Sequence, residues 1–244
     1  MLLLAGAIAA GVISLAHTAP FAFLFEAFRR SDSAWHLPAD PEAPSVYLTF
    51  DDGPNPATTP MLLDILRREE ASATFFLIDD HLTDETAPIV RRMFAEGHTV
   101  GLHSNERWLM LRGSDRIVEA LDQAANRIEQ LAGSRPCRWF RPHAGWRSVA
   151  LYEALDRMDY RLAGWSFGLW DWNWGRAREG DALADRLASR AHAGDIIVIH
   201  DGHHANPRAD RQYAVEATAQ LIPALRARQI GFAPLPCGST ESTD

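Results

Sequence analysis

The chain contains no lysine: all 24 of its basic residues are arginine, against 32 acidic residues. Mechanisms that need a lysine, such as Schiff-base chemistry or a P-loop, are therefore excluded. The formal net charge of -8 argues against nucleic-acid binding, which needs a basic surface to displace counterions. Cysteine is also scarce. Cys137 and Cys237 lack the paired spacing of a zinc site and permit either one disulfide or two buried thiols.

A long apolar segment opens the chain. We interpret residues 1–28 as a signal or membrane-anchor segment, because they are long enough to cross a bilayer. Arg29 and Arg30 follow this segment, and by the positive-inside rule they would keep the next domain in the cytoplasm. An extracytoplasmic domain, anchored to the membrane or secreted, needs a missing upstream basic segment or cleavage near Ala16. Residues 29–43, rich in Pro, Asp and Ser, are predicted to form a linker.

Short apolar runs then alternate with segments of helical periodicity over residues 44–237, ahead of a polar tail at 238–244. The predicted strands cover 46–50, 73–78, 98–102, 138–140, 160–165, 195–199 and 231–235, and the predicted helices cover 61–70, 87–97, 114–131, 149–158, 182–191 and 211–228. This alternation predicts one α/β domain, a (β/α)7-type distorted TIM-like barrel with its helices outside. In that arrangement we expect Cys137 to lie too far from Cys237 to bridge.

Two adjacent carboxylates, Asp51 and Asp52, end the first predicted strand and are followed by Gly-Pro. Like charges side by side cost free energy unless a cation or a strong donor lies between them, so the pair suggests a metal ligand beside a general base. An isolated Asp-Asp-Gly is more often a turn that caps a helix. Here, however, His103, Arg141 and His200 end three other strands. Because the carboxyl ends of parallel strands meet at one rim, these side chains indicate an active site.

These strand ends resemble the polysaccharide deacetylases of carbohydrate esterase family 4, the NodB-homology domain. The resemblance is carried by Thr49 to Pro54, Gly101 to Ser104, Phe140 to Gly145, Trp165 to Trp172 and Val198 to Asp201, in the order of the family's motifs. It implies a hydrolase that removes acetyl groups from an N-acetylated or O-acetylated polysaccharide or oligosaccharide.

The same resemblance implies a role for each matching residue. Asp51 would be the general base, Arg141 would orient it, and His200 would be the general acid. The fourth motif would bind substrate through Trp165, Trp170, Asp171 and Trp172.

A divalent metal (Zn, Co or Mn) is also implied, held by Asp52 and His103. The family's second metal histidine falls on Arg107, which stays protonated and cannot ligate a metal. Glu106 could supply an oxygen ligand instead. Alternatively, the Arg107 guanidinium takes the place of the metal by pairing with Asp52. His143 stands where the third motif has a proline or an aromatic residue.

The fourth motif departs from the family as well. Gly168 stands where the family's fourth motif has an aspartate that tunes the catalytic histidine. Tuning of His200 would then come from Asp171 or Asp201.

Two other readings compete with a deacetylase. Gly164 to Gly168 matches G-x-S-x-G, with Ser166 as a hydrolase nucleophile, but the Trp-rich residues that follow do not suit the helix that a nucleophile elbow needs. A barrel that binds glycan without turnover would fit the replacements at Arg107 and Gly168, but it would not require Asp51.

Overall fold

The computed structural model describes residues 33–104, 106, 108–166 and 179–238. Within them, one parallel sheet has the strand order β1-β6-β5-β4-β3-β2-β7, and β8 pairs with β2. The strands are β1 (Ser33–Ala34), β2 (Ser45–Gly53), β3 (Thr74–Ile78), β4 (Thr99–His103), β5 (Trp139–Arg141), β6 (Arg161–Ala163), β7 (Ile196–His200) and β8 (Gly231–Phe232). The helices are α3 (Thr59–Arg68), α4 (Ala87–Ala95), α5 (Ser114–Ala132), α6 (Val149–Met158), α7 (Gly180–Arg190) and α8 (Gln212–Arg226), with short 3-10 turns η1 (Asp79–His81), η2 (Leu109–Leu111) and η3 (His143–Gly145).

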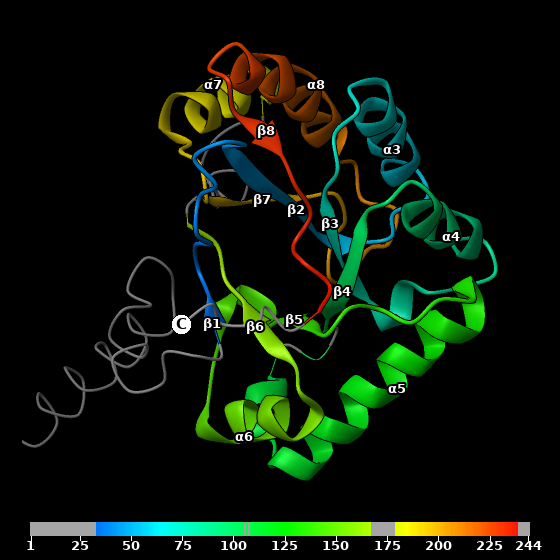
Figure 1. The fold of residues 1–244 in the computed structure, drawn as a ribbon. Helices are drawn as coiled ribbons and strands as arrows, with labels where there is room; N and C mark the ends of the chain where they lie inside the picture. The colour runs from blue at the N-terminus through cyan, green and yellow to red at the C-terminus, as the bar shows by residue number, and fades with distance from the viewer. Residues whose placement is uncertain (1–32, 105, 107, 167–178, 239–244) are drawn as a thin grey trace, which may run out of the picture.

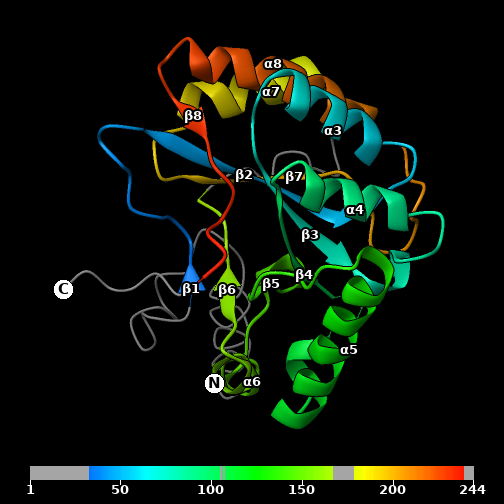
Figure 2. The same ribbon diagram turned by 45° about the vertical axis from the view of Figure 1, so that its right-hand side comes forward.

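The sheet curls into a half-barrel with the helices on its outer face (Figures 1 and 2). The predicted distorted TIM-like barrel is thereby confirmed. One strand was not expected: β1 forms in the segment predicted to be a linker, and it pairs with β6. The other strands and the helices lie where the periodicity predicts them, with shifted ends. No helix in the described ranges is long and apolar enough to span a bilayer, and residues 1–28 lie outside those ranges.

Alternate residues of the strands belong to two separate apolar cores. On β3, Phe75 and Leu77 pack toward the helices, whereas Phe76 points into the barrel. The same alternation places Val198 of β7 in the barrel interior with Phe76. This two-sided burial explains why the strands read as continuous apolar runs in the sequence.

Ser166 bridges the gap between β6 and β7. Its amide donates to the Ile196 carbonyl at 2.8 Å, and its hydroxyl donates to the Trp35 carbonyl at 2.7 Å. The Ile196 amide donates to the same hydroxyl at 3.1 Å. Ser166 therefore links the end of β6 to the start of β7. Because its hydroxyl both donates and accepts a hydrogen bond there, the geometry gives no support to Ser166 as a nucleophile.

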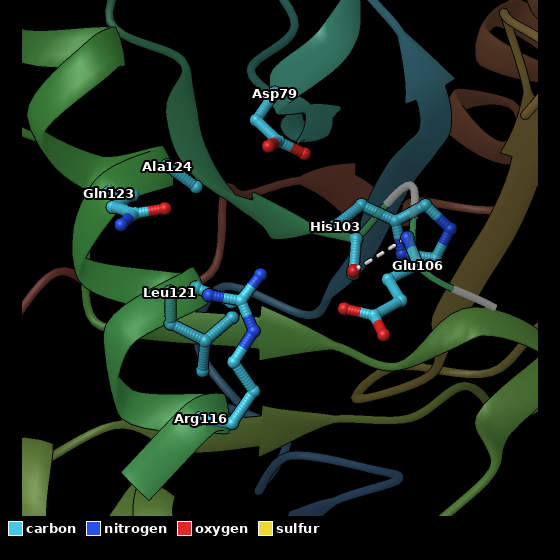
Figure 3. A pocket seen from close by; sticks show the side chains of 9 residues that line it. Asp79, His103, Glu106, Arg116, Leu121, Gln123 and Ala124 are labelled. Atoms are coloured by element: carbon cyan, nitrogen blue, oxygen red, sulfur yellow. Dashed lines mark hydrogen bonds between the residues drawn. The ribbon is translucent and has the colours of Figure 1, made fainter. Parts of the chain in front are cut away.

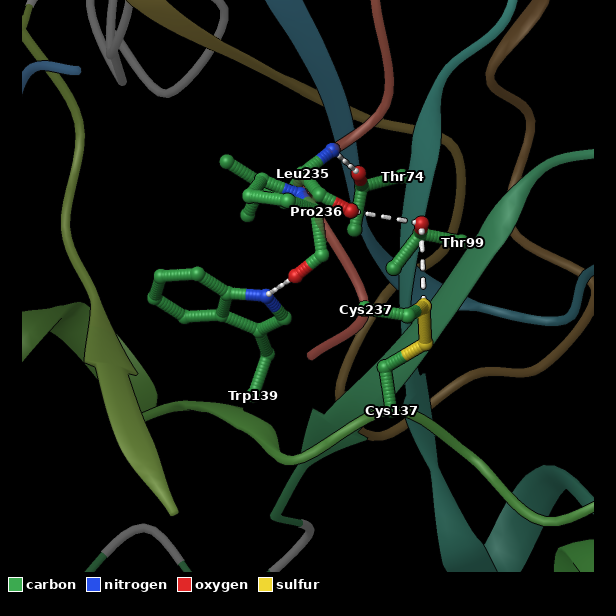
Figure 4. The surroundings of a disulfide bond; sticks show 7 residues. All are labelled: Thr74, Thr99, Cys137, Trp139, Leu235, Pro236 and Cys237. Carbon is green, nitrogen blue, oxygen red and sulfur yellow. Dashed lines mark hydrogen bonds between the residues drawn. A yellow bond between two sulfur atoms is a disulfide. The ribbon is translucent and has the colours of Figure 1, made fainter. Parts of the chain in front are cut away.

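The segment after β8 plugs the bottom of the barrel. Leu235 is fully buried in the interior core, where its amide donates to Thr74 Oγ1 at 2.9 Å and its carbonyl accepts from Thr99 Oγ1 at 2.7 Å. Trp139 Nε1 donates to the Pro236 carbonyl at 2.9 Å. The chain thus crosses beneath the starts of β3, β4 and β5 (Figure 4), rather than extending as the strand predicted up to residue 235.

A disulfide between Cys137 and Cys237 fixes the plug, with the two Cα atoms 5.3 Å apart (Figure 4). The expectation that these cysteines lie too far apart was wrong. The two cysteines meet because the segment after β8 crosses beneath the barrel and carries Cys237 to the start of β5. The bond closes a loop with a sequence separation of 100 residues, and in a chain-entropy model such long loops give the larger stabilisations.

The end of β7 packs directly against the end of β2. The Gly202 amide donates to the Asp51 carbonyl at 3.2 Å. A Cβ atom added to Gly202 would lie 1.8 Å from the carbonyl oxygen of Asp52. Because that neighbour is backbone, it cannot turn aside, so glycine is required where the two strand ends meet.

We expect the Cys137→Ala/Cys237→Ala double variant to lose about 2–4 kcal/mol in free energy of unfolding, because its unfolded chain is no longer cross-linked. Urea denaturation measures this loss. Reductant should lower the wild type to the level of the double variant and leave the double variant unchanged. Equal stability of the wild type with and without reductant would contradict the assignment.

We expect Gly202→Ala to lose about 1–3 kcal/mol in free energy of unfolding, the usual range for overpacking, because the new methyl group meets backbone. Gly113→Ala is the matched control, since a Cβ there meets nothing within 4 Å. Thermal and urea denaturation of both variants provide the comparison. If the two variants are equally stable, the close approach of β7 to β2 is not as described.

Candidate active site and metal centre

Asp51 and Asp52 are brought to one rim of the barrel by an irregularity in β2. The pairing of β2 with β3 shifts register between Asp51 and Gly53, and Asp52 has a φ of 70°. Adjacent residues of a regular strand point to opposite faces. A bulge with its residue in the left-handed region re-aims a side chain, and aspartate tolerates that region better than most residues. Both carboxylates are therefore available to the same site.

Asp51 is held by a buried arginine. Nη1 of Arg141 donates to Asp51 Oδ1 and to Thr49 Oγ1, both at 2.7 Å. The rest of the guanidinium is fixed by backbone, since Nε donates to the Ala163 carbonyl at 3.3 Å and Nη2 to the Gly164 carbonyl at 2.7 Å. Arg141 has no exposed surface, so it sets the orientation of Asp51 rigidly.

Asp52 faces a histidine whose tautomer is set by the backbone. Nδ1 of His103 lies 2.6 Å from the Arg141 carbonyl oxygen. A carbonyl only accepts, so Nδ1 carries the hydrogen, and in the neutral ring Nε2 is left with a lone pair. That Nε2 lies 3.2 Å from Asp52 Oδ1. Two acceptors at this separation need a proton or a metal ion between them.

His143 completes a cluster of potential ligands. Asp52, His103 and His143 each place one ligand atom within 4.8 Å of the others, a grouping found among the described residues. The His143 ring stacks on that of His103, with ring centroids 5.4 Å apart. It is presented by η3, in which Ala144 adopts a φ of 49°. One carboxylate and two imidazoles suit Zn or Co, so these residues fit the metal implied by the sequence.

The electrostatics agree with a cation site. Burial alone would raise the pKa of the Asp52 carboxyl, but the hydrogen bond and charge of His103, with the charges of His200 and His143, hold that pKa well below its usual range. Burial would lower the pKa of His103, yet Asp52 and Asp51 together raise it. In the absence of metal, the proton between Asp52 and His103 is therefore strongly held, and a metal ion must displace it.

His81, in η1, supports Asp52 through the backbone. Its Nδ1 lies 3.1 Å from the Asp52 carbonyl oxygen and donates to it. Burial, the largest effect, lowers the pKa of His81, so the ring stays neutral near neutral pH. No role was predicted for His81, because no sequence motif marks a residue that acts through a backbone carbonyl.

His200 ends β7 beside the two acids and is paired in register with Asp51. The next residue, Asp201, is fully buried, and its Oδ2 accepts a hydrogen bond from the Thr59 hydroxyl. Burial, with the charges of Asp52 and Asp51, raises the pKa of Asp201 to about 7. Its side chain is thus directed toward the start of α3, and tuning of His200 by Asp201 stays a prediction.

A polar cavity of about 430 Å³ opens beside His103 (Figure 3). Asp79 lines it from the end of β3, Glu106 from the loop after β4, and Arg116 and Gln123 from α5. Its volume falls within the range of small-molecule binding pockets. Of the three candidate ligands, His103 alone lines this hydrogen-bonding space.

Several predicted site residues lie elsewhere. Glu106 is outside the ligand cluster, because its Oε1 pairs with Arg112 Nε at 2.7 Å. Trp165, predicted to bind substrate, is only 4% exposed and packs in the barrel interior beneath η3, where a Cβ on Gly145 would lie 2.9 Å from its ring. Burial leaves little of the Trp165 ring accessible to a substrate, and its predicted role in substrate binding stays a prediction.

Four other predicted residues, Arg107, Trp170, Asp171 and Trp172, lie outside the described residues. The candidate ligand that was not predicted from the sequence is His143. The sequence did contain a signal for it: a histidine follows a strand end at a position where the family's third motif has a proline or an aromatic residue.

Comparison with known proteins agrees with the geometry. Residues 39–163 match the polysaccharide deacetylase family. The chitooligosaccharide deacetylase of Sinorhizobium fredii is 37% identical over 202 residues, which cover 80% of this chain and 91% of that protein. The crystal structure of the peptidoglycan N-acetylglucosamine deacetylase Bc1960 superposes with a TM-score of 0.74 at 26% identity, covering 87% of this chain and 94% of that one.

A family 4 acetyl xylan esterase from Clostridium thermocellum, solved with a cobalt ion, has a TM-score of 0.66 at 30% identity, over 78% of this chain and 87% of that one. The matched region contains the two acids of β2, His103 and Arg141. The chain therefore belongs to the polysaccharide deacetylase family.

Proposed function

We propose that this protein is a metal-dependent hydrolase that removes acetyl groups from N-acetylglucosamine units of a chitooligosaccharide or peptidoglycan type of glycan. The observation that carries the proposal is the placement of Asp51, fixed by Arg141, beside the Asp52, His103 and His143 cluster. The names of its relatives support the substrate class.

The proposal assigns a residue to each step of amide hydrolysis. Asp51 takes a proton from the attacking water, and Arg141 keeps its carboxylate aimed at the site. His200 gives a proton to the departing amine as acetate leaves. Bound to Asp52, His103 and His143, a divalent ion (Zn, Co or Mn) would polarise the acyl carbonyl as a Lewis acid.

His143 makes the replacement of the family's second metal histidine by Arg107 compatible with metal binding. A third ligand from η3 restores a set of one carboxylate and two imidazoles. With that set present, neither Glu106 nor the Arg107 guanidinium is needed at the cation site. Retention of Asp51 favours catalysis over a barrel that only binds glycan.

We infer that the domain works outside the cytoplasm. The Cys137 to Cys237 disulfide supports this location, because disulfides persist in oxidising compartments. The apolar segment 1–28 would then be an anchor or a cleaved signal, despite Arg29 and Arg30 on its C-terminal side. Polysaccharide of a cell envelope is the matching substrate.

Acetate release from N-acetylglucosamine oligomers, with added Zn or Co, tests the proposed function. We expect a chelator to abolish release and Asp51→Asn to lower kcat by about 10²–10⁴-fold, the usual contribution of a general base. Bound metal should be unchanged in Asp51→Asn. Asp122→Asn, at a surface acid of α5 that pairs with Arg135, is the matched control and should keep full activity.

Release of acetate only from O-acetylated xylan would replace the amide substrate by an ester. If metal-loaded wild type releases acetate from neither substrate, the catalytic proposal fails.

A further inference from the structure

Two tryptophans meet at the rim beside the metal cluster. Trp108 follows β4 and is 55% exposed, and Trp146 directly follows η3. Their ring centroids are 5.9 Å apart, with planes tilted by 59°. Trp146 packs partly against the helix-side core, so it anchors the pair while Trp108 presents its ring to solvent.

The pair adjoins the proposed catalytic site directly. His143 and Trp146 stand on either side of the same turn, η3, and both line one small cavity together with Glu106. That cavity and the larger polar one share Ser104 and Glu106. Trp108 lines neither cavity, and its ring contact with Trp146 places it beside this loop.

Exposed apolar side chains gather on the same two rim segments. Within the described ranges, the exposed large hydrophobic residues are Met61, Trp108, Leu111 and Val149. Leu111 ends η2 in the loop of Trp108, and Val149 begins α6 three residues after Trp146, where η2 packs on α6. Apolar surface that is gathered beside a polar site usually serves binding.

We propose that Trp108 and Trp146 form a stacking surface for a sugar unit next to the one that is deacetylated. The inference rests on the proposed function and deepens it, since it assigns a second subsite to the same glycan. A flat aromatic ring matches the apolar face of a pyranose, and the indole N–H remains available to a hydroxyl. The Glu106 and Arg112 side chains, which pair with each other in the same loop as Trp108, offer hydrogen-bond partners to the sugar hydroxyls.

The occupant is a neutral glycan of several units. The candidate metal ligands fix where one sugar unit must place its acetyl group. Trp146 directly follows η3, the turn that carries the ligand His143, so the Trp pair lies close to that point. The pair is separate from the substrate-binding residues predicted from the fourth motif, of which Trp165 is buried and Trp170 and Trp172 lie outside the described residues. It should therefore determine how strongly long oligomers are preferred.

Kinetics of acetate release from N-acetylglucosamine oligomers of two to six units test the subsite. We expect Trp108→Ala to raise KM for the longest oligomers by about tenfold, with kcat within about twofold of the wild type, since only one binding contact is removed. Trp108→Phe should restore most of the affinity, because it keeps a flat ring. Met61→Ala, which removes an exposed apolar side chain of α3 outside these two segments, should behave as the wild type.

Calorimetric binding of chitohexaose to Zn-loaded wild type, Trp108→Ala and Trp108→Phe gives a readout that needs no turnover. If wild type binds the hexamer through Trp108 but releases no acetate, the subsite stands and the proposed function fails. Acetate release with equal KM in wild type and Trp108→Ala at every length overturns the subsite alone. So does a Trp108→Ala defect that appears only in binding to anionic lipid vesicles.

Discussion

The buried guanidinium of Arg141 is the constraint on which the site depends. Its Nη1 holds the proposed base, Asp51, while its backbone carbonyl fixes the tautomer of His103. One residue thus orients both the proposed base and a candidate ligand of the cation. A buried arginine is tolerated only when its donors are satisfied, and the strand ends of β2 and β6 provide those acceptors.

This arginine in turn rests on the interior of the barrel. Its guanidinium lies over the ring of Phe76, 4.1 Å from the centroid, and Phe76 shares the interior core with Trp139 and Leu235. The Cys137 to Cys237 disulfide secures the plug that closes this core from below. Through Phe76, the core that the plug closes at the bottom of the barrel therefore contacts the arginine that orients the site at the top.

Much of the fold could be read from the sequence because strong periodicities mark it. Val46 to Phe50 is an apolar run that ends in two acids, and α5 shows one clear apolar face, so both were predicted close to their observed limits. Asp51, Asp52, His103 and Arg141 were found because parallel strands bring their ends to one rim. These predictions depend on local pattern and on a general rule of topology.

The rest depends on contacts that no local pattern encodes. The disulfide joins residues separated by 100 positions, and it forms only because the segment after β8 turns beneath the barrel. Trp165 follows a strand end like a rim residue, yet the tight turn of η3 covers it. His143, a candidate ligand, lies in η3 beside the left-handed Ala144, and its ring stacks on that of His103, a contact that no local pattern announces.

The central claim is that one cation is shared by Asp52, His103 and His143. Anomalous diffraction from crystals of the cobalt-loaded protein tests it most directly. We expect one strong peak within bonding distance of the Asp52 carboxylate and of both imidazoles, at about 2.0–2.2 Å. A peak that lacks His143 among its ligands, or a guanidinium in place of any peak, would contradict it.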